Sequence, residues 1–123
     1  MGRPVVHFEI MGQDGAKLRA FYADLFDWEL DADNEFDYGV VDREHNLSSE
    51  GVGIGGGVGG VPGGQAGHVT FYVEVPDVEA GLAQAEELGG TRLMGPEEIM
   101  PGVEIGILHD PEGNMIGLIK GQP

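Results

Sequence analysis

The sequence predicts an α+β fold made of two βαβββ repeats, because the second half of the chain follows the pattern of the first. His7 opens the run HFEIMGQDGAKLRAFYADLF, and His68 opens the run HVTFYVEVPDVEAGLAQAEEL. In each run, a histidine in an extended apolar stretch is followed by an aspartate, Asp14 or Asp77, and then by an amphipathic helical pattern. We expect one domain over residues 1–123, with repeats at about 4–60 and 66–121. Such a duplication brings the two histidines together and marks a candidate site between the repeats.

The first repeat begins with an alternating strand at Val5–Ile10, on which His7, Glu9 and Met11 share one face. Asp14 is placed to cap the helix that follows. The apolar side chains of this helix recur at helical spacing, at Leu18, Phe21, Tyr22, Leu25 and Phe26. Three further strands are predicted at 28–30, 36–41 and 51–58.

The second repeat follows the same order. Its first strand carries His68, Thr70, Tyr72 and Glu74 on one face and valines with Phe71 on the other. Asp77 is placed to cap a helix that ends at Gly89-Gly90, where glycine supplies a left-handed conformation. Strands are expected at 91–93, 103–109 and 115–120, the last two joined by a tight turn with the sequence Asp-Pro-Glu-Gly-Asn.

The segment Gly51–Gly64 is rich in glycine and contains formal matches to the dinucleotide-binding pattern GxGxxG. That pattern binds a pyrophosphate only where a helix follows at once, and here Pro62 and two glycines follow instead. We therefore interpret the segment as a glycine-rich strand that runs into the link between the repeats. Its bare backbone would line a pocket or let another chain approach closely.

Charge and composition exclude several classes of function. The chain has 22 acidic and 6 basic residues and a net charge of −16, which disfavours binding to nucleic acids and to anionic membranes. It has no cysteine, which excludes thiol catalysis and thiolate metal sites. No apolar run is long enough to span a membrane, and the N-terminus lacks the apolar region of a signal peptide. We expect a cytoplasmic protein.

Three motifs give the whole chain a family resemblance. HFEI with a histidine on the first strand, FYADLF followed by Trp28, and DPEGN before the last strand together resemble the vicinal oxygen chelate superfamily. This superfamily includes glyoxalase I, bleomycin-resistance proteins and extradiol dioxygenases, and the chain is most similar to its lactoylglutathione-lyase-related branch. The resemblance implies that the two modules form a curved mixed sheet shaped like a cup. It also implies a homodimer and, in catalytic members, a divalent metal at the floor of the cup.

The metal ligands that the resemblance implies are only partly present. The two histidine ligands match His7 and His68, but the carboxylate of the last strand falls at Gly117 and the fourth-strand ligand falls within Gly53–Gly57. Two of four glyoxalase-type ligands remain, or two of the three in a site of two histidines and one carboxylate. Two imidazoles without a carboxylate bind a divalent ion weakly, which argues against standard glyoxalase or dioxygenase chemistry.

Strand alternation gives the side chains that would line the cup. They are His7, Glu9 and Met11 from the first repeat, and His68, Thr70, Tyr72 and Glu74 from the second. Of these, we assign ligand binding to His7, Glu9, His68, Thr70 and Tyr72. Glu9 is the candidate catalytic residue, either as a replacement carboxylate or as a general base without metal, and its alternative role is simply to pair with a histidine.

The remaining aromatic and titratable side chains have structural interpretations. His45 lies in a polar run that predicts an exposed hairpin loop, and His109 precedes the turn at Asp110 and is expected at the surface. Tyr72 supplies either a hydroxyl to the cup or a ring to the core. Trp28 has the spacing of a core residue.

The sequence therefore supports a protein that binds a small organic molecule between its repeats without a complete metal site. The alternative is a metal-dependent lyase, isomerase or dioxygenase that uses His7, His68 and Glu9 with Zn, Ni, Fe or Mn. A third interpretation, an interaction module, depends only on the glycine-rich segment and the expected homodimer. The predicted cup face has no lysine or arginine to bind the carboxylates of glutathione, which argues against glutathione-linked chemistry.

Overall fold

The computed structural model describes residues 2–30, 32, 37–63 and 65–121. The chain forms two compact units. The N-terminal unit is His7–Val69, and the C-terminal unit combines Met1–Val6 with Thr70–Pro123. Their elements are β1 (Val5–Gly12), α1 (Gly15–Phe26), β2 (Tyr38–Val41), the 3-10 helix η1 (Arg43–His45), β3 (Gly55–Gly60), β4 (His68–Glu74), α2 (Val78–Glu87), β5 (Thr91–Met100), β6 (Val103–His109) and β7 (Met115–Lys120).

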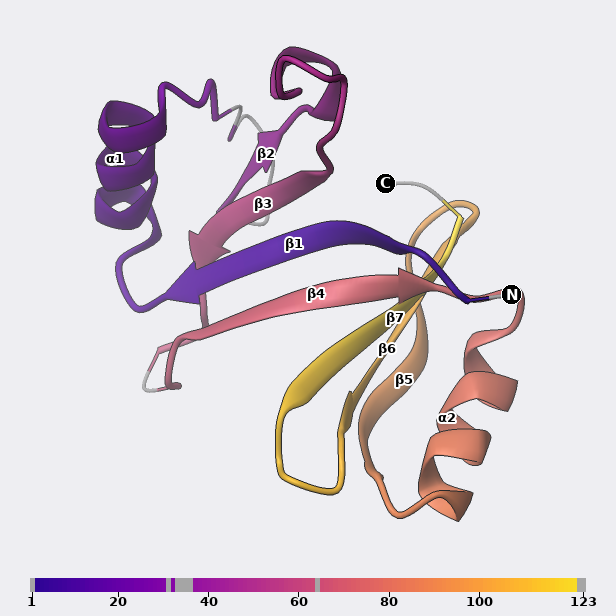
Figure 1. The fold of residues 1–123 in the computed structure, drawn as a ribbon. Coiled ribbons are helices and arrows are strands. Elements are labelled where there is room, and N and C mark those ends of the chain that lie inside the picture. The colour runs from indigo at the N-terminus through magenta and orange to yellow at the C-terminus, as the bar shows by residue number, and fades with distance from the viewer. Residues whose placement is uncertain (1, 31, 33–36, 64, 122–123) are drawn as a thin grey trace. The chain divides into compact units, whose positions relative to one another are not determined.

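In the N-terminal unit, β3 lies between β1 and β2 (Figure 1). β1 runs parallel to β3, with Glu9 opposite Gly57, and β2 runs antiparallel to β3. Helix α1 contacts β3 and begins where the sequence predicts, because the Asp14 carboxylate accepts a hydrogen bond of 3.0 Å from the backbone N–H of Lys17. Gly15 lets the start of α1 approach β3, since a Cβ there would lie 2.7 Å from the backbone nitrogen of Gly60.

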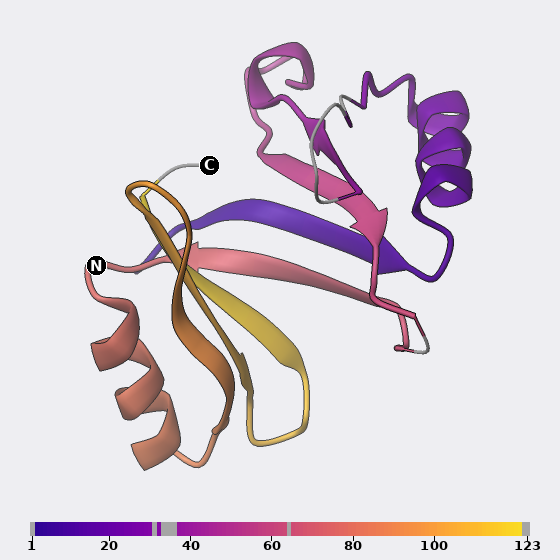
Figure 2. The same cartoon turned by 180° about the vertical axis from the view of Figure 1, so that it is seen from behind.

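In the C-terminal unit, the strand order is β4-β7-β6-β5, with β4 parallel to β7 and the other pairs antiparallel. Helix α2 contacts β5, β6 and β7, as Figure 2 shows from behind. The predicted cap is confirmed, because the Asp77 carboxylate accepts from the Ala80 N–H at 2.9 Å. Gly89, just beyond the helix, has the predicted left-handed conformation with φ of 100°.

Both faces of the strands in the C-terminal unit carry a core. One cluster of buried side chains packs with α2 and consists of Val78, Leu82, Leu108 and Leu118. The other cluster consists of Tyr72, Val103, Ile107 and Ile119. Neighbours in sequence, such as Leu118 and Ile119, enter different clusters because successive strand residues point to opposite faces. A sheet that is buried on both faces explains the continuous apolar runs of β6 and β7.

The fold class is confirmed, while some predicted boundaries are corrected. The strand predicted at 28–30 is wrong, since Trp28 lies in irregular backbone after Asp27 ends α1 with φ of 59°. The ring of Trp28 instead packs against those of Phe8, Tyr22 and Phe26, with centroids 5.1–5.7 Å apart. The strand predicted at 36–41 begins at Tyr38, Phe36 lying outside the described residues.

Further boundaries shift along the sequence. The strand predicted at 51–58 is β3 at Gly55–Gly60, and the one predicted at 91–93 extends to Met100 as β5. The turn before β7 is confirmed, with the Asp110 N–H bonded to the Asn114 carbonyl at 2.9 Å. Neither described helix is long and apolar enough to cross a membrane.

Candidate ligand-binding site

The candidate site begins with two polar side chains on one face of β1. His7 and Glu9 are two residues apart on a strand, so both side chains point to the same side of the sheet, as the sequence predicts. The parallel neighbour β3 places Gly55 opposite His7 and Gly57 opposite Glu9. Because these two positions have no side chain, a side chain from another strand can lie against β3 beside the polar groups on this face.

Glu9 pairs with His68, the first residue of β4, and all of these atoms belong to the N-terminal unit. Oε2 of Glu9 lies 3.0 Å from Nε2 of His68. The Glu9 side chain is 14% exposed and that of His68 is 26% exposed, so water screens the pair only partly. The pairing of Glu9 with a histidine, one of the two roles inferred from sequence, is therefore present in the structure.

His7 pairs with Tyr38, a residue that the sequence reasoning did not select. The hydroxyl oxygen of Tyr38 lies 2.8 Å from Nε2 of His7, and the two rings are nearly parallel, with an interplanar angle of 16°. Burial lowers the pKa of His7, and the nearby Glu9 carboxylate opposes that shift by raising it. The neutral imidazole is therefore favoured at neutral pH.

Aromatic rings fill the space beside Gly117, where the resemblance implies a carboxylate ligand, and beside Gly57, which lies in the Gly53–Gly57 range of the other expected ligand. A Cβ added at Gly57 would overlap the ring of Tyr38, and a Cβ at Gly117 would lie within 2.8 Å of three ring carbons of Tyr72. On the opposite face of β3, a Cβ at Gly56 would overlap the ring of Phe8. The glycines of these strands thus allow aromatic side chains to lie flat against the backbone.

The two site residues predicted in the C-terminal unit are buried within that unit. The Thr70 hydroxyl donates to the backbone carbonyl of Met115 at 2.6 Å. Tyr72 is 5% exposed and belongs to the core cluster with Val103, Ile107 and Ile119. The packing role, which the sequence left open for Tyr72, is therefore observed. Ligand binding by Thr70 and Tyr72 stays a prediction.

The donor set does not fit a tightly held divalent metal. In the part of the chain that the structure describes, no three histidine, aspartate or glutamate side chains are arranged to hold an ion. Nε2 of His7 and Nε2 of His68 each face a hydrogen-bond partner from the protein. The other histidines do not add a ligand: His45 pairs with Asp42 at 2.7 Å on the surface, and His109 ends β6.

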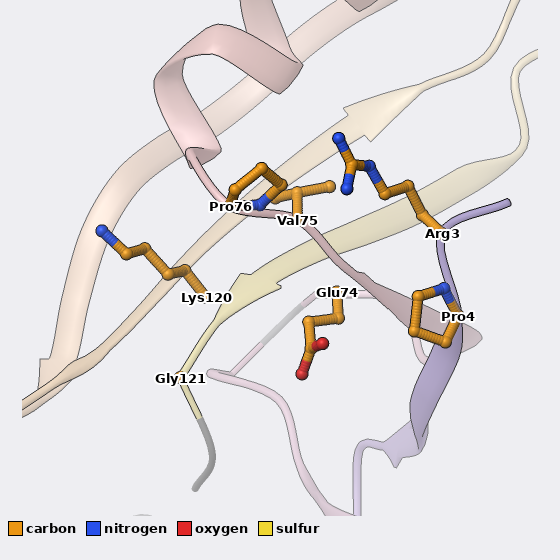
Figure 3. A pocket seen from close by; sticks show the side chains of 7 residues that line it. All are labelled: Arg3, Pro4, Glu74, Val75, Pro76, Lys120 and Gly121. Atoms are coloured by element: carbon orange, nitrogen blue, oxygen red, sulfur yellow. The ribbon is translucent and has the colours of Figure 1, made fainter. Parts of the chain in front are cut away.

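A separate cavity of about 300 Å³ lies in the C-terminal unit (Figure 3). Val75 and Pro76 line it between Lys120 and Arg3, while the Glu74 carboxylate points away from both cations. None of the residues assigned to ligand binding lines this cavity. The candidate site on β1 and β4 thus depends on the contacts between its polar groups and not on this cavity.

Comparisons with known proteins agree with this fold. A family model described as "Glyoxalase-like domain" matches residues 7–119. Methylmalonyl-CoA epimerase from Streptomyces coelicolor, solved as a variant with 2-nitronate-propionyl-CoA, is similar in structure with a TM-score of 0.62 at 19% identity, over 100% of this chain and 99% of the other. A glyoxalase/bleomycin resistance protein/dioxygenase superfamily member from Vibrio splendidus gives a TM-score of 0.62 at 16% identity, over 96% and 98% of the two chains. No curated protein matched the chain.

Proposed function

Because this chain belongs to the glyoxalase-like domain family, we propose that it binds a small organic molecule at His7, Glu9 and His68 without a complete metal site. One observation carries the proposal: protein groups already bond Nε2 of both histidines. A divalent metal bound through these Nε2 atoms would have to displace both partners, and Gly57 and Gly117 supply no further ligand. The metal-dependent lyase, isomerase or dioxygenase alternative lacks this support.

The site chemistry favours ligands that are uncharged or cationic. Glu9, His68, His7 and Tyr38 together provide a carboxylate, two imidazoles and a phenol, and none of these is a permanent cation. The chain also has a net charge of −16, which disfavours the approach of anions. The epimerase complex from Streptomyces coelicolor holds a coenzyme A derivative, whose phosphates are anionic, and its identity of 19% supports the fold alone. A coenzyme A derivative is therefore not the ligand that we propose for this chain.

Metal analysis of the purified protein tests the first part of the proposal. We expect no stoichiometric Zn, Ni, Fe or Mn. Stoichiometric metal that disappears in the double variant His7→Ala, His68→Ala would overturn the proposal and support the metal-dependent alternative.

Binding of three planar probes tests the second part. Benzamidine, benzamide and benzoate have similar shapes but are cationic, neutral and anionic, so they separate charge from size. We expect benzamidine and benzamide to shift the imidazole NMR signals of His7 and His68, and benzoate to bind more weakly. Glu9→Gln should weaken benzamidine binding about tenfold or more, because a hydrogen bond to a charged group is lost. His45→Ala, which changes an exposed histidine, is the matched control. Equal binding of all three probes, or none, contradicts the proposal.

We also propose that the protein is a homodimer, as the family resemblance implies, and that it is cytoplasmic, as its sequence led us to expect. Phe21, Leu25 and Phe26 of α1 support association, because each is more than half exposed. Light scattering on the eluted protein should give twice the mass of the 13.0 kDa chain. A monomeric mass over the whole concentration range would exclude the dimer.

A further inference from the structure

Tyr38 reaches across an entire strand because β3 lacks side chains where its ring passes. Tyr38 lies on β2 opposite Gly59 of β3, and its ring covers the backbone of Gly57. Any other residue at position 57 would place a Cβ inside the ring. Its hydroxyl nevertheless meets His7 on β1, two strands away, or about 10 Å across the sheet. The glycines of β3 thus allow Tyr38 of β2 to contact His7 of β1.

The contact between Tyr38 and His7 fixes both the position and the hydrogen-bonding role of the imidazole. The oxygen–nitrogen distance of 2.8 Å is that of a well-formed hydrogen bond, and the rings lie 16° from parallel. A neutral imidazole has one donor and one acceptor nitrogen, so a partner at Nε2 decides where the ring proton resides. A phenol keeps its proton to a pH of about 10 and is the natural donor to a neutral imidazole.

We propose that Tyr38 is a positioning residue of the ligand site, whose hydroxyl donates to Nε2 of His7 and holds the imidazole in the tautomer protonated on Nδ1. The expected effect of Tyr38 on ligand binding rests on the proposed function, whereas its effect on the His7 tautomer does not. A ligand then meets a fixed pattern of donors and acceptors on the β1 face, rather than an imidazole that exchanges between two tautomers. Pre-organisation of this kind strengthens binding by lowering the cost of ordering the site.

Nitrogen NMR of histidine-labelled, ligand-free protein at pH 8 tests the assignment directly, because the tautomers have different ¹⁵N shifts. We expect the wild-type protein to show His7 protonated on Nδ1. Tyr38→Phe keeps the ring and removes the donor, so it should give a mixture of tautomers or the Nε2-protonated form. Gly57→Ala should do the same by displacing the ring. Gly56→Ala is the matched control on the same strand, since it disturbs Phe8 on the opposite face and should leave the His7 tautomer unchanged.

The outcomes separate this inference from the proposed function. A wild-type His7 protonated on Nε2, or a Tyr38→Phe variant with an unchanged tautomer, overturns the role of Tyr38 whether or not a ligand binds. If the tautomer changes as expected, Tyr38→Phe should also weaken benzamidine binding by about three- to tenfold, the usual effect of one hydrogen bond. A changed tautomer with no probe binding in the wild-type protein rejects the proposed function and keeps the positioning role.

Discussion

Replacing Gly117 with alanine is expected to destabilise the C-terminal unit by about 1–3 kcal/mol, the usual cost of overpacking a core. The new methyl carbon would lie within 2.8 Å of three carbons of the Tyr72 ring, whereas ordinary contacts begin at 3.4 Å. The nearest of these carbons would lie at 2.4 Å, so either the ring or the backbone must move by about 1 Å to reach an ordinary contact. Tyr72 cannot swing into water easily, because it is 5% exposed and packs with Val103, Ile107 and Ile119.

Urea denaturation followed by circular dichroism measures this loss. Gly2→Ala is the control, because a Cβ at Gly2 meets no atom within 4 Å and should change stability by less than about 0.5 kcal/mol. Tyr72→Ala removes the overlapping ring, so its combination with Gly117→Ala should lose less stability than the two single losses added together, by about 0.5–3 kcal/mol. A Gly117→Ala variant as stable as the control, or strictly additive losses, would refute the argument that the ring fills the space of the expected metal ligand.

Three further predictions concern stability. Burial lowers the pKa of His7, so around and below pH about 6.5 the unfolded chain binds more protons than the folded protein. The free energy of unfolding should therefore fall as the pH is lowered through this value. His7→Gln should make the urea midpoint depend less on pH. Asp77→Ala removes the cap of α2 and should cost about 1 kcal/mol, while Asp77→Asn, which keeps a capping oxygen, should cost less in the same urea titration. Leu82→Ala should cost about 2–5 kcal/mol by thermal or urea unfolding, because Leu82 is fully buried between α2 and the sheet; a loss below about 1 kcal/mol would contradict its place in the core.

Features set by nearby residues could be predicted from the sequence. Asp14 and Asp77 cap their helices through backbone groups three residues away, and the turn at Asp110 closes on Asn114. Such contacts depend on short segments whose chemistry is visible in the sequence. The period-two pattern likewise placed His7 and Glu9 on one face of β1.

Features set by packing between distant segments could not be predicted. A strand was predicted at 28–30, but in the structure the ring of Trp28 packs against those of Phe8, Tyr22 and Phe26 and its backbone joins no strand. The hydrogen bond from the Thr70 hydroxyl to a backbone carbonyl of β7 was likewise not predicted. Neither outcome has a local signal, because the partner lies elsewhere in the chain.

The sequence by itself determined the α+β class, the helix caps and the two histidines that mark the candidate site, while the first repeat lacks the strand predicted at 28–30. The sequence also has glycines where the family resemblance implies further metal ligands. Only the tertiary structure decided what those glycines do: they make room for the rings of Tyr38 and Tyr72. The physical reason is that the effect of a glycine on packing depends on which group occupies the space beside it. Here that group is a ring from a neighbouring strand, which the local sequence does not identify.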